Sequence, residues 1–160
     1  MNRTNSAEET VSAAIEKYAD MVRRICFLQL KNSADVEDVF QDVFLKYYLN
    51  SGMLQEERHQ KAWLCRVTYN KCKDMNKSVW SRRTVSINDL EIPFENEEES
   101  ELMAAVLRMS PADKNLIYLH YFEGLTIPEI AEITRQKTNT VYSQLRRARG
   151  KLKREMGELS

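Results

Sequence analysis

The sequence predicts an all-α protein with two small helical domains joined by an acidic linker. Only four Gly and three Pro occur among the 160 residues, which favours helices over a sheet rich in turns. Apolar residues recur at helical spacing in long stretches on either side of an acidic segment. That segment, residues 84–101, holds seven acidic and no basic residues. We place the domains at 7–83 and 100–157, with the flexible linker at 84–99.

The first domain opens with two predicted helices. The first covers residues 7 to about 30, where apolar side chains keep the period of one buried face. Asn32 and Ser33 can both cap the second, which covers 35–50 and ends at Ser51 and Gly52. Its predicted core stripe is Val36, Val39, Phe40, Val43 and Tyr47. The opposite face carries Asp38, Gln41, Asp42 and Leu45, and is either simply solvated or a docking face for a basic partner.

The third predicted helix, about residues 60–79, is basic on its outward side. Leu64, Val67, Thr68 and Met75 are expected to face inward. Residues 61–83 contain seven basic residues and one acidic residue. Cations, an amide and flanking rings suit single-stranded nucleic acid, although Trp63 and Tyr69 are more simply explained as core or boundary residues. The candidate contacts are Arg66, Asn70, Lys73 and Lys77.

The three cysteines are expected to be reduced, packed thiols. Cys26, Cys65 and Cys72 are odd in number and lie within helical patterns. Cys65 and Cys72 share a helix face and follow His59, but the spacing matches no zinc motif. We predict no metal site and no cofactor.

The second domain is predicted to contain helices at about 98–109 and 113–122. Ser110 and Pro111 form a helix start, and Glu123 with Gly124 ends the second of these helices. His120 lies in the apolar part of that helix and is expected to be a packed histidine rather than a catalyst.

The last part of the chain predicts a helix-turn-helix. Thr126 and Glu129 have capping-box spacing before a short helix, and residues 135–137 interrupt its apolar pattern. Thr138 can cap a second helix that runs to about Met156. Its apolar stripe is Val141, Leu145, Ala148, Leu152 and Met156.

The face opposite that stripe is polar and strongly basic. Residues 133–154 contain eight basic residues and no acidic one. A helix anchored by one face and presenting Asn, Ser, Tyr and Arg on the other suits a DNA major groove, although a solvated amphipathic helix is the simpler alternative. The candidate DNA contacts are Thr138, Asn139, Tyr142, Ser143, Arg146, Arg147 and Arg149.

The sequence predicts neither an enzyme nor a membrane protein. It contains no Ser-His-Asp set, phosphate-binding Gly loop or metal cluster, so we expect no catalytic residue. The polar N-terminus lacks a signal peptide's apolar segment, and the longest apolar run is too short to span a bilayer. We therefore expect a cytoplasmic protein without membrane insertion.

These motifs resemble the bacterial RNA polymerase sigma factors, specifically the small two-domain extracytoplasmic-function (ECF) group. The stretch DVEDVFQDVFLKYY is similar to the region 2 helix that docks on the clamp of the polymerase's largest subunit. KAWLCRVTYNKCKDM is similar to the following minus-ten recognition and melting helix. LRMSPADKNLIYLHYFEGLTIPEIAEI and TVYSQLRRARGKLK are similar to region 4, which reads the minus-35 element. The resemblance covers about residues 13–153.

The resemblance implies a factor that directs core RNA polymerase to promoter DNA and helps to open it. It implies clamp contacts at Asp38, Gln41, Asp42 and Phe44, and places Asn70 near a flipped minus-ten base. It implies minus-35 contacts at Tyr142, Ser143, Arg146 and Arg147, with Arg149 and Lys151 nearer phosphate. An anti-sigma factor is an expected partner.

Two other functions fit parts of the sequence. One is a stand-alone helix-turn-helix regulator that binds duplex DNA as a dimer; the basic, aromatic third helix argues against a dimer interface there. The other is a sigma-like interaction protein that has lost promoter use, which the arginines of the last helix argue against. Where the family usually has an Arg run after the region 2 helix, this chain has Asn76, Lys77 and Ser78.

Overall fold

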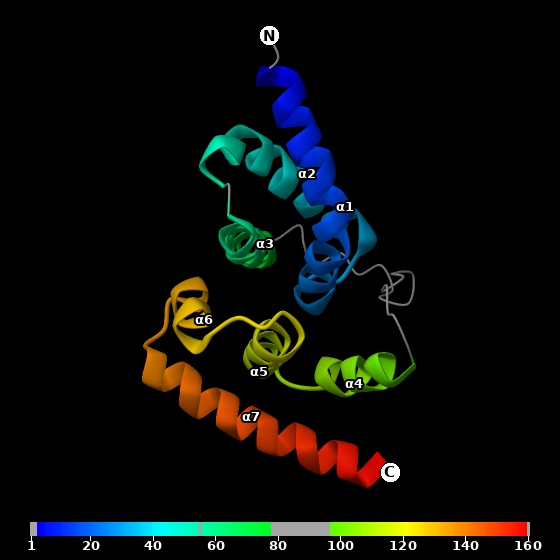
Figure 1. Ribbon diagram of the computed structural model, residues 1–160. Coiled ribbons are helices and arrows are strands. Elements are labelled where there is room, and N and C mark those ends of the chain that lie inside the picture. The colour runs from blue at the N-terminus through cyan, green and yellow to red at the C-terminus, as the bar shows by residue number, and fades with distance from the viewer. Residues whose placement is uncertain (1–2, 55, 78–96, 160) are drawn as a thin grey trace. The chain divides into compact units, whose positions relative to one another are not determined.

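The protein consists of two compact helical units, Met1–Ile92 and Pro93–Ser160 (Figure 1). The computed structural model describes residues 3–54, 56–77 and 97–159, and within them every regular element is a helix. The predicted all-α class with two helical domains is therefore confirmed. The domain boundaries stay predictions, because most of the acidic linker at 84–99 lies outside the described residues.

The first unit is built from three long helices and a short turn of 3-10 helix. α1 (Arg3–Gln29), α2 (Ser33–Asn50) and α3 (Glu57–Lys77) pack on one another in pairs, and η1 (Ser51–Met53) follows α2 (Figure 1). Asn32 is the cap of α2: its side-chain oxygen accepts the Asp35 backbone N–H at 2.8 Å. The fully buried side chains of this core include Val22, Ile25, Leu28, Leu30, Tyr47 and Leu64.

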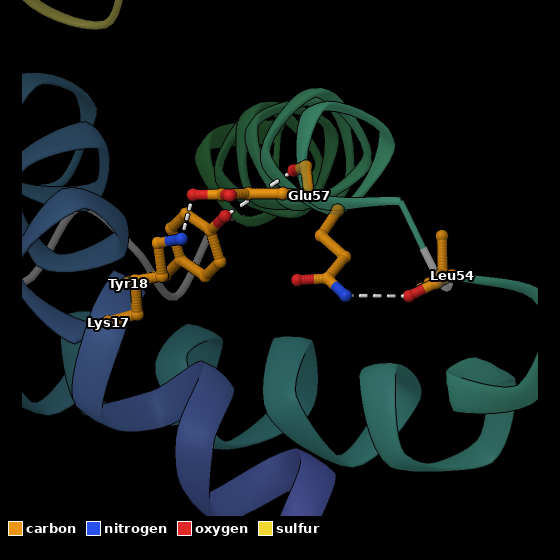
Figure 2. Close-up of polar contacts among 5 residues, drawn as sticks. Lys17, Tyr18, Leu54 and Glu57 are labelled. Carbon is orange, nitrogen blue, oxygen red and sulfur yellow. Dashed lines mark hydrogen bonds and ion pairs between the residues drawn. The ribbon is translucent and has the colours of Figure 1, made fainter.

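Contacts at both ends fix α3 against the rest of its unit. At its start, Glu57 forms an ion pair with Lys17 of α1, and its carbonyl accepts the Tyr18 hydroxyl at 3.4 Å (Figure 2). Gln60 donates from Nε2 to the Leu54 carbonyl at 2.8 Å. At its far end, the Asn76 amide donates to the Gln29 carbonyl, also at 2.8 Å. The direction of α3 is therefore set by polar contacts as well as by its apolar face.

The three cysteines are buried free thiols in the core of the first unit, as predicted. The Cys65 thiol lies 3.7 Å from the Met21 sulfur. A hydrogen bond to Cys26, together with burial, raises the pKa of the Cys72 thiol well above its usual value. His59 is exposed and its Nδ1 lies 3.4 Å from a carboxylate oxygen of Glu56, so it does not join the buried cysteines. These thiols act as small packing groups.

The second unit is organised around its last helix. α4 (Glu97–Leu107), α5 (Pro111–Ile117) and α6 (Ile127–Thr134) all contact α7 (Thr138–Leu159) (Figure 1). Val141, Leu145 and Ala148 of the predicted α7 stripe are buried, whereas Leu152 and Met156 are half-buried toward its end. Among the described residues of both units, no helix has the length and apolar character needed to cross a membrane.

The predicted single helix at 113–122 is wrong in its second half. α5 ends at Ile117, and Tyr118–Phe122 forms a π-helix, η4. Residues 115–119 are buried without interruption, so this segment lacks the solvent-facing side of an ordinary amphipathic helix. The Tyr118 hydroxyl donates to Glu123 at 2.5 Å, and its ring stacks on Phe122. His120 is partly buried and contacts the Leu125 carbonyl at 2.8 Å, as expected of a packed histidine.

The segment from α6 to α7 has a predicted cap at the start of α6 and an unpredicted strained residue at the end of α6. The capping box is confirmed: Thr126 accepts the Glu129 backbone N–H, and Glu129 accepts that of Thr126. Thr138 is the first residue of α7 rather than its cap, because the Lys137 carbonyl accepts the Val141 N–H. Arg135 ends α6 in the left-handed region, with φ of 54°. A residue other than Gly is rarely found there.

Replacing Arg135 by Gly is expected to stabilise the second unit relative to Arg135→Ala. Both variants remove the same charged side chain, but only Gly adopts a positive φ without a steric penalty. The free energy needed to open α6 and α7 is expected to be about 1 kcal/mol higher in Arg135→Gly than in Arg135→Ala. Amide hydrogen exchange of α6 and α7 in the intact chain measures it. Equal protection in the two variants would contradict a strained Arg135.

The buried thiols are expected to resist modification in the native protein. The raised pKa of Cys72 leaves little thiolate at pH 8, and burial blocks access, so a disulfide reagent should react roughly a hundredfold more slowly than after denaturation. The rate should rise as the pH increases above the ordinary thiol pKa. Rapid reaction of one thiol with the reagent in the native protein at pH 8 would contradict this prediction.

Candidate nucleic-acid and partner surfaces

The exposed face of α2 carries the predicted acidic residues. Asp38, Gln41 and Asp42 are all exposed, and they lie opposite the buried residues Val39 and Val43. The α2 helix is capped at Asn32 and packed on both α1 and α3, so these side chains project from a fixed backbone. This face can meet a partner that supplies cations.

Phe44 does not share that surface. The resemblance places it among the docking residues, but its side chain is 4% exposed. Its ring packs in the core against Phe40, with the ring centroids 4.8 Å apart. Phe40 in turn lies under the Arg23 guanidinium of α1, 4.0 Å from its ring centroid. Phe44 therefore belongs to the packed interior of the first unit instead of facing a partner directly.

The outward face of α3 presents the predicted basic residues. Lys73 and Lys77 are exposed, while Arg66 and Asn70 are half-buried. Leu64, Val67 and Thr68 point into the core as predicted, and Thr68 donates its hydroxyl to the Leu64 carbonyl at 2.6 Å. Cations therefore lie along one side of a helix whose other side is fully packed, which suits a strand of nucleic acid.

The two aromatic rings of α3 lie at the boundary of the core. Trp63 is half-buried and meets the buried Tyr47 ring edge-on, with the centroids 6.0 Å apart. Tyr69 is half-buried too, and burial raises the pKa of its hydroxyl. Each ring keeps part of its surface in solvent next to the basic face. Both rings therefore have packing roles while remaining near any bound strand.

The exposed face of α7 brings together the predicted DNA-contacting side chains. The buried Val141, Leu145 and Ala148 fix the rotation of the helix about its axis. Gln136 donates to Gln144 at 3.2 Å and so ties the preceding turn to the helix. The predicted residues that are exposed are Thr138, Asn139, Tyr142, Ser143, Arg146, Arg147 and Arg149. This is a continuous polar and cationic surface beginning at the N-terminal end of the helix.

Two ion pairs join α7 to the preceding part of its unit. Lys151 contacts Asp113 of α5 at 3.3 Å, and Glu155 contacts Arg108 just beyond α4. No local sequence pattern predicts either pair, because the partners are far apart along the chain. Lys151 therefore contributes to holding α7 in place, whereas Arg146, Arg147 and Arg149 extend toward solvent.

Part of the exposed α2 surface was not predicted from the sequence. Leu49 is 71% exposed and Met53 is 84% exposed, beyond the 60% exposed Leu45. The signal was present in the sequence as the four-residue steps from Leu45 to Leu49 to Met53. Their exposure gives the α2 face an apolar half.

Two family models match the chain, one in each unit. The sigma-70 region 2 model matches residues 14–82, and the sigma-70 region 4 model matches residues 99–152. The first match contains α2 and α3, and the second contains all of α5 and α6 and most of α7. The three candidate surfaces thus lie within the matched regions.

Curated relatives match over nearly the whole chain. The RNA polymerase sigma factor SigV of Bacillus subtilis is 24% identical over 152 residues, covering 92% of each chain. The ECF RNA polymerase sigma factor SigW of the same organism is 21% identical, covering 95% of this chain and 91% of the relative.

Solved structures share the fold. The sigma factor RpoE of Bartonella quintana, solved with the anti-sigma factor NepR, has a TM-score of 0.67 at 18% identity, covering 91% of this chain and 96% of that one. CnrH, solved with the cytosolic domain of CnrY, has a TM-score of 0.61 at 19% identity and 96% coverage of both chains. Because region 2 and region 4 matches together span most of the chain and its curated relatives are sigma factors, the chain belongs to the sigma-70 family of bacterial RNA polymerase sigma factors, in the ECF group.

Proposed function

We propose that this sigma factor binds core RNA polymerase and directs it to recognise and open specific promoters. The observation that carries the proposal is the separation of exposed charge onto different helix faces. Acid lies on α2, whereas the outward faces of α3 and α7 are basic. One face suits a protein partner and two suit nucleic acid, as a promoter-opening factor requires.

Core polymerase binding is assigned to α2. Asp38 and Asp42 are one helical turn apart and exposed, with Gln41 beside them. A basic element on the clamp of the polymerase's largest subunit would complement these charges and guide association. Phe44 remains in the proposal only as a core residue.

Minus-ten recognition is assigned to the outward face of α3. Arg66, Lys73 and Lys77 would follow the phosphates of the unpaired non-template strand. Asn70 is half-buried and carries both a donor and an acceptor, so it suits the edge of an extruded base. Extrusion costs a few kcal/mol, which contacts of this kind must offset. The end contacts of α3 hold it in position for this task.

Minus-35 recognition is assigned to the exposed face of α7. Tyr142, Ser143, Arg146 and Arg147 would enter the major groove, and Arg149 would lie nearer the phosphates. Thr138 and Asn139 lie at the N-terminal end of the helix, where its dipole favours phosphate. Because one small domain neutralises few phosphates, binding of the free protein to duplex DNA should be weak and salt-dependent.

The proposed function needs neither a catalytic step nor a cofactor. The protein would act in the cytoplasm, where the polymerase acts, and an anti-sigma factor would be its regulatory partner. The structure of the similar RpoE is of a complex with such a factor. The dimeric regulator is not retained, because the relatives over nearly the whole chain are sigma factors.

Reconstitution with core polymerase tests the function, and Arg147→Ala tests the α7 assignment. We expect the wild-type protein to direct run-off transcription from discrete start sites on genomic DNA. Loss of one groove-contacting arginine should lower transcription from promoters with a minus-35 element about tenfold or more, while core binding is unchanged.

Arg154→Ala is the matched control for that prediction. Arg154 is exposed and lies two turns beyond Arg147 on the same arc, so the variant loses the same charge from the same helix. It should lose much less activity. Equal losses of transcription and core binding in Arg147→Ala would rule out a role specific to the minus-35 element.

A double substitution of Asp38→Arg and Asp42→Arg tests the docking face. Reversing two exposed charges should weaken core binding by about a hundredfold or more, because cations would then face cations. Equilibrium binding of labelled protein to purified core polymerase measures the effect. Thermal unfolding should change little, because neither carboxylate is buried.

The matched control reverses the same number of charges elsewhere in the first unit. Glu8 and Glu9 are exposed on α1, and Glu8→Arg with Glu9→Arg should bind core polymerase nearly as well as the wild type. Retained core binding in the Asp38 and Asp42 variant would overturn the docking assignment.

A further inference from the structure

The largest exposed apolar side chains of the first unit lie along the solvent-facing stripe of α2 and η1. Of the five exposed large hydrophobic residues in the described part of the chain, three are Leu45, Leu49 and Met53. Leu45 and Leu49 lie one turn apart on α2, about 6 Å along its axis, and Met53 follows in η1. Such a cluster on a monomer's surface indicates an interaction site.

This apolar cluster continues the acidic surface along the same helix. Asp38, Asp42, Leu45 and Leu49 are spaced at steps of four, three and four residues, so they occupy one stripe. The buried residues Val39, Val43 and Tyr47 lie on the other side of the helix. The stripe is therefore acidic at its N-terminal half and apolar at its C-terminal half, with no break between the two.

The exposed apolar residues can supply the apolar docking contact that was expected at Phe44. The family resemblance assigned one apolar docking residue, but Phe44 is buried and unavailable to a partner. A protein interface normally combines charged contacts with an apolar centre that is closed off from water. Leu45, Leu49 and Met53 are the exposed apolar residues next to the carboxylates.

We propose that Leu45, Leu49 and Met53 form the apolar half of the core polymerase docking surface, which extends from Asp38 through η1. This inference rests on the proposed polymerase binding of α2. The matching surface of the polymerase would present cations opposite Asp38 and Asp42, and aliphatic or aromatic side chains opposite the three apolar residues. The docking surface is thus longer than its acidic part.

A second copy of this chain is a poor occupant of the stripe. In a symmetric pair with antiparallel α2 helices, each acidic half would lie on the partner's apolar half. In a parallel pair, Asp38 and Asp42 would face their own copies. Both arrangements bury carboxylates without a cation, which is costly. A partner with both cations and apolar residues avoids that cost, and the continuity with the acidic face identifies it as the polymerase.

The test compares two triple variants of the 160-residue chain. Leu45→Gln, Leu49→Gln and Met53→Gln together remove the apolar surface while keeping a good helix former at each position. Leu45→Met, Leu49→Met and Met53→Leu keep it apolar with similar volume. We expect the first variant to bind purified core polymerase at least tenfold more weakly, and the second to bind within about twofold of the wild type.

Two further measurements separate this inference from the proposed function. Both triple variants should unfold at the wild-type temperature, and the Gln variant should keep the wild-type salt dependence of core binding, because its carboxylates are intact. If Asp38→Arg with Asp42→Arg weakens binding but the Gln variant does not, the apolar docking half is refuted and the acidic one stands.

Other outcomes are equally decisive. If neither set of variants changes core binding, both the inference and the docking assignment fail. Equal losses in the Gln and the apolar-conserving variants would overturn the inference, since apolar character would then not matter. Sedimentation of the wild type as a dimer that the Gln variant dissociates would assign the surface to self-association instead.

Discussion

Burial of a single apolar stripe on each long helix is the constraint on which the candidate surfaces depend. In α7, the buried Val141, Leu145 and Ala148 set the helix rotation against α4, α5 and α6. Full burial of a Val or Leu side chain is worth about 1.5–3 kcal/mol, so a rotation by one residue would expose most of that area. The exposure of Arg146 and Arg147 follows from that packing, with no separate interaction needed to turn them outward.

In α3 the same constraint is supplemented by polar contacts at both ends. The contacts of Glu57 with α1 lie at the first residue of the helix (Figure 2), and Asn76 donates to the Gln29 carbonyl near the last. A rigid helix held at both ends keeps the half-buried Asn70 in one place. Such preorganisation matters for extrusion of a base, because energy used to order the protein would not be available to hold the base.

Features set by local pattern could be predicted from the sequence, and features set by distant contacts could not. Caps at Asn32, Ser110 and Thr126 follow from residue type and spacing, because their hydrogen bonds close within a few residues. The α7 face follows from its period. The π-helix at Tyr118–Phe122 follows a run of buried residues, 115–119, and has no such local signal.

Phe44 shows the same contrast between what local pattern predicts and what distant contacts decide. On a helical wheel it lies at the edge of the α2 stripe, where the pattern alone leaves both exposure and burial open. The structure buries it, with its ring against Phe40, which lies under the Arg23 guanidinium of α1. The pairing of Lys151 with Asp113 was likewise beyond a sequence pattern, because 38 residues separate the partners.

The two halves of the α2 surface suit different stages of one binding event. Exposed carboxylates such as Asp38 and Asp42 act over about 8–10 Å in physiological salt, so they raise the rate of encounter with a basic partner. Leu45, Leu49 and Met53 act only on contact, and excluding water from them slows dissociation. A factor that must find the polymerase quickly and then remain bound through promoter opening benefits from both. In the proposed docking, this division would account for the large apolar side chains on an otherwise charged surface.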